Sequence, residues 1–210
     1  MVPAIRAIGS CRFQALAAGL RATWLEDVIS MRALVVYESM YGNTREIASH
    51  IADGLRAYYE VTLVPVAEAT AELVAGADLL VAGAPTHMHG LPSASSRRMA
   101  AQAAAKEGSE LRMVSGAGGP GMANWLRDLG RRDGLAAAFD TRLNGVPVFT
   151  GRASRPIARL LKRHGRRLVA VSESFMVGSQ NTLLNGETAR ARRWGMTLGA
   201  ASKTYLPAPA

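Results

Sequence analysis

Residues 37–44, YESMYGNT, combine side chains and backbone groups that could hold a phosphate without any positive charge. The stretch follows an apolar run and precedes a helix-like pattern, and the free N–H groups at the start of a helix attract anions. Gly42 permits a close approach to the backbone, and Ser39, Asn43 and Thr44 add short neutral hydrogen-bonding groups. The stretch lacks the lysine of nucleoside triphosphate loops. It therefore predicts a phosphate monoester as the ligand, and an ordinary strand-to-helix turn remains the alternative.

Short apolar runs alternate with helical patterns along most of the chain. The apolar runs predict strands at 33–38, 61–66, 78–85, 136–141 and 167–175. The periodic segments between and after them predict helices at 44–59, 68–77, 93–108, 121–130, 154–165 and 186–201, with Ser93 as a cap. This alternation is typical of βαβ units, so we expect an α/β fold with a five-stranded, parallel, doubly wound sheet. In such sheets the ligand lies at the carboxyl ends of the strands.

The length and composition are those of one α/β domain. The chain has 210 residues, one Cys and no window of 18 unbroken apolar residues, which argues against a membrane span and fits a reducing, cytoplasmic location. Residues 1–30 precede the first strand and carry no secretory signal pattern. We expect residues 1–30 to be an N-terminal extension or start-site artefact, residues 31–204 to form the domain and residues 205–210 to be a tail.

The positive charge is concentrated in the last third of the chain. The whole chain has a net charge of +9, whereas residues 142–210 carry twelve basic residues against two acidic ones. Such a segment could attract an acidic protein, a nucleic acid or a phosphorylated cofactor, or could be a solvated arginine face.

A family resemblance adds to these observations. The segment VVYESMYGNTREIASHI, residues 35–51, resembles the flavodoxin signature, and the order of strands and helices from 31 to about 201 agrees with it. The resemblance implies a flavodoxin-like three-layer sandwich that binds FMN and holds the FMN phosphate without basic side chains. The residues that it assigns to the phosphate loop are Ser39, Met40, Tyr41, Gly42, Asn43 and Thr44.

The same resemblance places the flavin ring between the loops that follow the third and fourth strands. After the third strand the chain reads GAPTHMHGLP, and Pro85–Thr86 resembles the start of the flavin loop in flavodoxin-like quinone reductases. His87 or His89 could stack on the ring or donate to it, where flavodoxins usually place an aromatic residue. The predicted ring contacts are Pro85, Thr86, His87, Met88, His89, Gly90, Phe139, Asp140 and Thr141. By its position, Arg142 would also flank the ring beside the last three.

Two other motifs offer competing sites. His87 and His89 have a spacing that could serve a metal, but His50 and His164 lack ligand-like neighbours, so we expect no metal site. The segment GAGGPG, 116–121, matches GxGxxG, yet the order of elements makes it a linker between two helices. A glycine-rich linker could also act as a lid.

The function expected from this reading is electron transfer by an FMN-binding flavodoxin-like protein. No side chain stands out as a catalytic acid, base or nucleophile, which suits a protein whose flavin performs the oxidoreductase chemistry. Flavodoxins are typically acidic, so the basic last third favours an acidic redox partner or NAD(P)H. An NAD(P)H-dependent quinone or flavin reductase is therefore the first alternative. A flavin-free basic binding module is the second, although no nucleic-acid recognition motif supports it.

Overall fold

The structure is a computed structural model that describes residues 31–114, 117 and 119–205. The expected extension at 1–30 lies outside the described residues, as do positions 206–210 of the expected tail. Within the described residues, no helix is long and apolar enough to cross a membrane.

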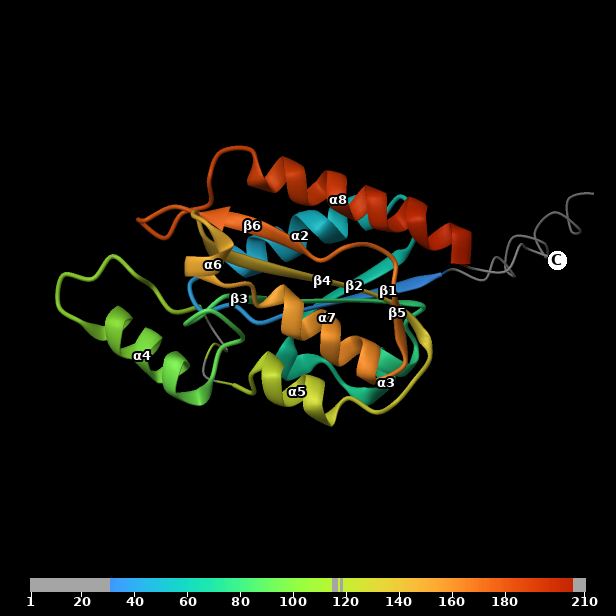
Figure 1. Cartoon of the computed structure of the whole chain (residues 1–210), viewed down its shortest axis with the longest axis horizontal. Coiled ribbons are helices and arrows are strands. Elements are labelled where there is room, and N and C mark those ends of the chain that lie inside the picture. Colours follow the sequence, from blue (N-terminus) through green and yellow to red (C-terminus); the bar gives the residue numbers. More distant parts are fainter. Residues whose placement is uncertain (1–30, 115–116, 118, 206–210) are drawn as a thin grey trace, which may run out of the picture. The chain divides into compact units, whose positions relative to one another are not determined.

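One parallel sheet forms the centre of the described domain (Figure 1). Its order is β2-β1-β3-β4, and both of the last two strands pair with β4. The strands are β1 (Arg32–Tyr37), β2 (Glu60–Pro65), β3 (Leu79–Pro85), β4 (Gly134–Leu143), β5 (Arg166–Leu168) and β6 (Glu173–Val177). This is the flavodoxin-like doubly wound order, and it confirms the fold class expected from the sequence.

The fifth strand position is divided, where the sequence predicts one strand at 167–175. Leu168 and Glu173 are five residues apart in the sequence, whereas the β4 residues with which they pair, Ala136 and Phe139, are three residues apart. The edge of the sheet therefore carries two extra residues, which bulge out of the ladder and leave Val171 86% exposed. A break of this kind depends on pairing with β4, and the apolar pattern does not reveal it.

Helices cover both faces of the sheet. Helices α2 and α8 lie on one face, and α3, α5 and α7 lie on the other (Figure 1). The helices are α2 (Asn43–Leu55), α3 (Ala71–Ala75), α4 (Ala94–Ala105), α5 (Met122–Asp128), α6 (Pro147–Thr150), α7 (Ser154–Arg163) and α8 (Glu187–Ser202), with 3-10 turns η1 (Val66–Glu68) and η2 (Lys203–Tyr205). The four-residue α6 is the one α-helix of this set that the sequence patterns do not predict.

The core follows from the alternation of side chains along β1. Ala33 and Val35 pack under α2 and α8, whereas Leu34 and Val36 pack on the opposite face. On the α2–α8 face, three aromatic rings meet edge to face with centroids 6.1–6.3 Å apart. These rings belong to Phe139, Phe175 and Trp194.

Helix α4 packs against the loop that follows β1. Ser93 caps α4 and forms a reciprocal capping box with Ser96, as expected for the cap residue. The Tyr41 hydroxyl donates to the carbonyl of Ala100 at 2.8 Å. The backbone N–H of Val114, beyond the helix, donates to the Met40 carbonyl at 2.9 Å. Helix α4 and the segment after it thus support the loop that carries the candidate phosphate site.

Candidate functional site

The YESMYGNT stretch forms the turn between β1 and α2. Gly42 is the N-cap residue of α2 and has a φ of 102°, a conformation that favours glycine. Its backbone N–H donates to Ser39 Oγ at 3.1 Å, which bends the loop over the start of the helix. The first N–H groups of the 13-residue α2 have no acceptor within the helix, so they are available to an anion.

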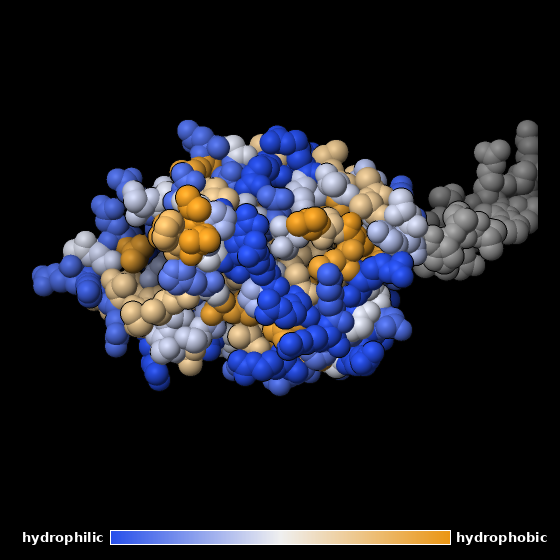
Figure 2. Space-filling view, in the orientation of Figure 1, coloured by the Kyte–Doolittle hydropathy of each residue, from blue (hydrophilic) through white to orange (hydrophobic). Residues whose placement is uncertain are grey.

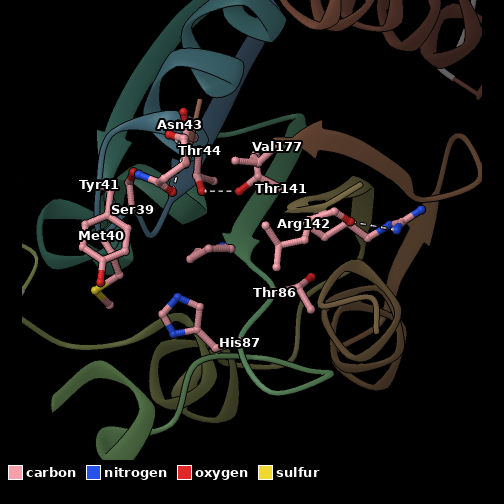
Figure 3. A pocket seen from close by; sticks show the side chains of 13 residues that line it. Ser39, Met40, Tyr41, Asn43, Thr44, Thr86, His87, Thr141, Arg142 and Val177 are labelled. Carbon is pink, nitrogen blue, oxygen red and sulfur yellow. Dashed lines mark hydrogen bonds between the residues drawn. The ribbon is translucent and has the colours of Figure 1, made fainter. Parts of the chain in front are cut away.

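A pocket of about 230 Å³ opens at the carboxyl ends of β1, β3 and β4. Side chains from all three strand ends and from the start of α2 point toward it (Figure 3). Its lining residues are Ser39, Met40, Tyr41, Asn43, Thr44, Pro85, Thr86, His87, Thr141, Arg142, Leu143, Val177 and Asn181. The pocket thus occupies the edge of the sheet where a doubly wound fold binds its ligand.

The structure gathers nine of the fifteen residues predicted for the site around this pocket. They are Ser39, Met40, Tyr41, Asn43, Thr44, Pro85, Thr86, His87 and Thr141. The remaining six, which do not line it, are Gly42, Met88, His89, Gly90, Phe139 and Asp140. A Cβ on Gly42 would lie 3.7 Å from Val114 Cγ1, an ordinary contact, so its positive φ constrains this position more than space does.

Residues 87–90 form a tight turn that separates the two histidines. His87 and Gly90 exchange two backbone hydrogen bonds, 2.9 Å and 3.0 Å long. Between them, Met88 and His89 have φ values of 46° and 73°, which non-glycine residues adopt infrequently. The turn leaves Met88 75% exposed and aims His87 into the pocket (Figure 3).

The position of His87 determines its charge. Burial lowers the pKa of His87 below its usual value, because the imidazolium form would lose its hydration. The ring is therefore neutral near pH 7, and it can offer the pocket one N–H donor or one nitrogen acceptor.

The three ring contacts predicted beside the fourth strand lie within β4 and take different roles. Thr141 lines the pocket, and its hydroxyl lies 2.7 Å from that of Thr44, which ties β4 to the start of α2. Phe139 is fully buried in the aromatic cluster. Asp140 points to the other face, where Oδ2 accepts from the backbone N–H of Ser154 at 2.7 Å. Burial raises the pKa of Asp140, and its contact holds the start of α7 beside the pocket.

Four lining residues lie outside the fifteen: Arg142, which the sequence already placed beside the ring, and Leu143, Val177 and Asn181, which the sequence patterns did not indicate. Arg142 and Leu143 end β4, Val177 ends β6 and Asn181 lies in the loop after β6. Both strands extend two residues beyond their predicted ends. Asn43 Nδ2 donates to the Asn181 carbonyl at 2.9 Å and so joins the first loop to the last one. The rule that ligands bind at strand ends could have drawn attention to these loops, although no motif marks them.

Arg142 presents only part of its side chain to the pocket. Its NH1 donates to the carbonyl of Gly145 at 2.8 Å and to Thr150 Oγ1 at 2.7 Å. The guanidinium group therefore holds α6 in place and points away from the pocket centre (Figure 3).

Glu38 has a buried carboxyl group and lies in the candidate phosphate loop. Its side chain accepts a hydrogen bond from the backbone N–H of Met122 at 2.8 Å, and Arg97 NH1 lies 3.8 Å from its other oxygen. Burial raises the pKa of Glu38, opposed by the Met122 hydrogen bond and by the charge of Arg97. The carboxylate thus links the loop to α4 and α5, at the cost of its desolvation.

Glu38 should therefore make stability depend on pH. A raised pKa in the folded state means that stability is greatest below the unfolded-state pKa and falls as the pH rises through the folded-state value. We expect Glu38→Gln, which keeps an oxygen acceptor for Met122, to become more stable relative to the wild type as the pH rises from 4 to 7. Unfolding by urea at several pH values measures this difference.

The exposed Glu107→Gln is the matched control, and its stability curve should run parallel to that of the wild type. A Glu38→Gln curve that also stayed parallel would show that Glu38 ionises at no cost in the folded protein.

The structure also shows the surroundings of the histidine pair and of the glycine-rich segment, the two motifs that could have formed competing sites. Among the described residues, no group of three or more His, Cys, Asp and Glu side chains is placed to hold a metal ion. The glycine-rich segment at 116–121 lies between α4 and α5, and Gly121 is the N-cap of α5. Positions 115, 116 and 118 lie outside the described residues.

Comparison with known proteins points to one family. Residues 35–146 match the family described as Flavodoxin. No curated protein sequence matches the chain.

Solved structures resemble the fold at low sequence identity. A flavodoxin from the domain Archaea has 16% identity and a TM-score of 0.56 and covers 82% of this chain and 99% of its own. Oxidised flavodoxin 2 from Bacillus cereus has 19% identity and a TM-score of 0.57, with 80% and 98% covered. The metal-soaked Flv1 flavodiiron core from Synechocystis sp. PCC6803 has 16% identity and a TM-score of 0.57, with 93% of this chain and 42% of that chain covered.

Proposed function

Because the chain belongs to the flavodoxin family, we propose that it binds one FMN at the pocket and transfers electrons between redox partners. The observation that carries the proposal is the start of α2, where a glycine-capped helix end and the short polar side chains of Ser39, Asn43 and Thr44 converge at the pocket. The family implies a flavin cofactor, usually FMN. The residues of the pocket fit a flavin that carries a single phosphate.

The phosphate would lie against residues 39–44. The free N–H groups of the first turn of α2 and the positive end of the helix dipole favour an anion there. Ser39, Asn43 and Thr44 line the adjoining pocket and would donate to phosphate oxygens. One monoester can be held in this way, because its charge is lower than that of a di- or triphosphate.

The ring would lie toward the mouth of the pocket. About 230 Å³ is less than the roughly 300–1,000 Å³ of enclosing ligand sites, so an FMN would extend beyond the pocket. Pro85, Thr86 and the turn at 87–90 would border the ring on one side, and Thr141 to Leu143 on the other. When bound, FMN supplies one- or two-electron chemistry, while the neutral His87 would offer a hydrogen bond and the lining would exclude water.

A titration with FMN tests this proposal. We expect FMN fluorescence to be quenched as the apoprotein is added, with one site per chain and submicromolar affinity. Riboflavin, which lacks the phosphate, should bind at least about tenfold more weakly, since it forgoes the charge-assisted hydrogen bonds of the helix end.

Two results would oppose the proposal. The absence of any flavin binding would refute it, and equal affinities for FMN and riboflavin would refute the assignment of the phosphate loop. Steady NADPH oxidation by the loaded protein alone, with a quinone as acceptor, would instead identify a reductase.

A further inference from the structure

One face of the molecule combines uncompensated positive charge with exposed apolar side chains. Residues 142–172 contain eight basic residues and no acidic residue. The next two acids along the chain, Glu173 and Glu187, both bind Arg190. Both carboxylates are therefore held by a guanidinium of α8, and neither pairs with a cation of the basic segment.

The basic residues of α7 form a stripe along the helix. Arg155, Arg159 and Lys162 are exposed, and their spacing of four and three places them on one side of α7. None of the three makes an ion pair with a residue of the described ranges. Figure 2 shows this stripe as a hydrophilic band over the position of α7.

A groove of about 600 Å³ runs between this stripe and the break in the fifth strand position. Its basic side is formed by Arg155, Arg159 and Lys162, and its other side includes Leu168, Val171 and Ser172. The groove thus pairs cations with an apolar wall and a hydroxyl group.

An apolar rim adjoins the basic stripe. The rim consists of Leu143, Val146, Val148 and Phe149, which are 57%, 61%, 78% and 75% exposed. The space-filling view shows a hydrophobic patch over α6, directly beside the hydrophilic band over α7 (Figure 2). Four large exposed apolar side chains within seven residues are typical of an interaction site.

Both surfaces are continuous with the candidate flavin pocket. Leu143 belongs to the rim and also lines the pocket. At the start of α7, the backbone N–H of Ala153 donates to Thr86 Oγ1, in the pocket wall, at 2.9 Å. The stripe therefore begins beside the pocket and runs along α7 from Arg155 to Lys162, about 10 Å.

We propose that this face, the apolar rim together with the α7 stripe and its groove, docks an acidic redox protein. Carboxylates of the partner would pair with the α7 cations, and an apolar patch around its redox centre would cover the rim at the pocket mouth. The redox role of this docking rests on the proposed electron-transfer function, whereas the docking itself requires no bound flavin. A nucleic acid would match the stripe but would leave the apolar rim uncovered, so a protein accounts for both features.

Binding to proteins of opposite charge tests the proposal. The probes are oxidised plant-type ferredoxin, an acidic one-electron carrier, and cytochrome c, a basic one, with calorimetric titration of both the apoprotein and the FMN-loaded protein. We expect ferredoxin to bind at low ionic strength and to weaken as salt is added, and cytochrome c to show no binding. The apoprotein and the loaded protein should behave alike, so a failure to bind flavin would not obscure the result.

Three sets of variants divide the face into its parts. Arg155→Gln/Arg159→Gln/Lys162→Gln should weaken ferredoxin binding roughly tenfold and flatten its salt dependence. Val148→Ser/Phe149→Ser should weaken binding at low and high salt alike, because it removes apolar contact. The control Arg192→Gln/Arg193→Gln/Lys203→Gln removes equal charge from α8 and η2, on the other side of the sheet, and should change affinity less than twofold.

Three results would overturn the proposal. Ferredoxin binding that is absent, or that responds equally to the α7 and α8 variants, would exclude a specific acidic docking site on this face. Tighter binding of a random-sequence DNA duplex than of ferredoxin, lost in the α7 variant, would assign the stripe to nucleic acid.

Discussion

Asn43→Asp is expected to lower the affinity for FMN by roughly 100-fold or more while changing the affinity for riboflavin little. Asn43 is the first residue of α2 and lines the pocket, so the new carboxylate would face the proposed phosphate site. Like charges about 5 Å apart at an effective dielectric constant of 20 repel by about 3 kcal/mol per unit pair. The ratio of FMN to riboflavin affinity, measured by fluorescence titration, isolates this repulsion from any change in the ring site.

The substitution should leave the helix intact, since a carboxylate is favourable in the first turn of a helix. It removes the amide that donates to Asn181, so a small loss of thermal stability is expected. Thr70→Asp is the control, because it adds a carboxylate at the N-cap of α3, which lies outside the pocket lining. A ratio that stayed at its wild-type value in Asn43→Asp would show that the phosphate binds elsewhere.

Gly54→Ala is expected to destabilise the fold by about 3 kcal/mol or more, the largest stability effect that we anticipate. Helices α2 and α8 approach so closely here that a Cβ on Gly54 would lie 2.1 Å from the Arg192 carbonyl oxygen. A Cβ on Gly195, on the other helix, would lie 2.3 Å from the Ile51 carbonyl oxygen. Both obstacles are backbone atoms, so the helices must separate. Chemical denaturation measures the loss.

Separation of helices α2 and α8 should also disturb the candidate flavin site. Helix α2 carries the candidate phosphate loop at its other end, so Gly54→Ala should weaken FMN binding as well as stability. Gly130→Ala is the control, because this glycine is exposed and a Cβ there would meet nothing within 4 Å. Equal unfolding free energies for the two variants would show that the α2–α8 contact tolerates a methyl group.

Much of the fold could be predicted because its signals are local. Each buried strand is an apolar run, each long helix has a periodic face, and Ser93 caps α4 through a contact three residues away. The strand-to-helix turn at 37–44 depends on its own glycine and polar residues in the same way. The doubly wound order then follows from the alternation of elements and from the family signature.

The remaining features depend on pairing between distant residues. The two extra residues between β5 and β6 exist only in relation to β4. Asp140 and Thr141 are adjacent in sequence, yet the pleat of β4 sends one to the start of α7 and the other to the pocket. Asn181 enters the pocket because the last loop folds back onto Asn43, 138 residues earlier.

The sequence by itself determined the fold class, the family and the loop that resembles a monophosphate site, because short-range patterns and backbone chemistry specify each of them. It also showed where the positive charge is concentrated, but not what surrounds that charge. Only the tertiary structure decided that the α7 stripe lies beside an apolar rim and the pocket mouth, because α6, α7 and the 87–90 turn meet through long-range contacts. The proposed monophosphate site accounts for the missing lysine in YESMYGNT by local backbone chemistry. The surroundings of the basic last third, in contrast, are visible only in the tertiary structure.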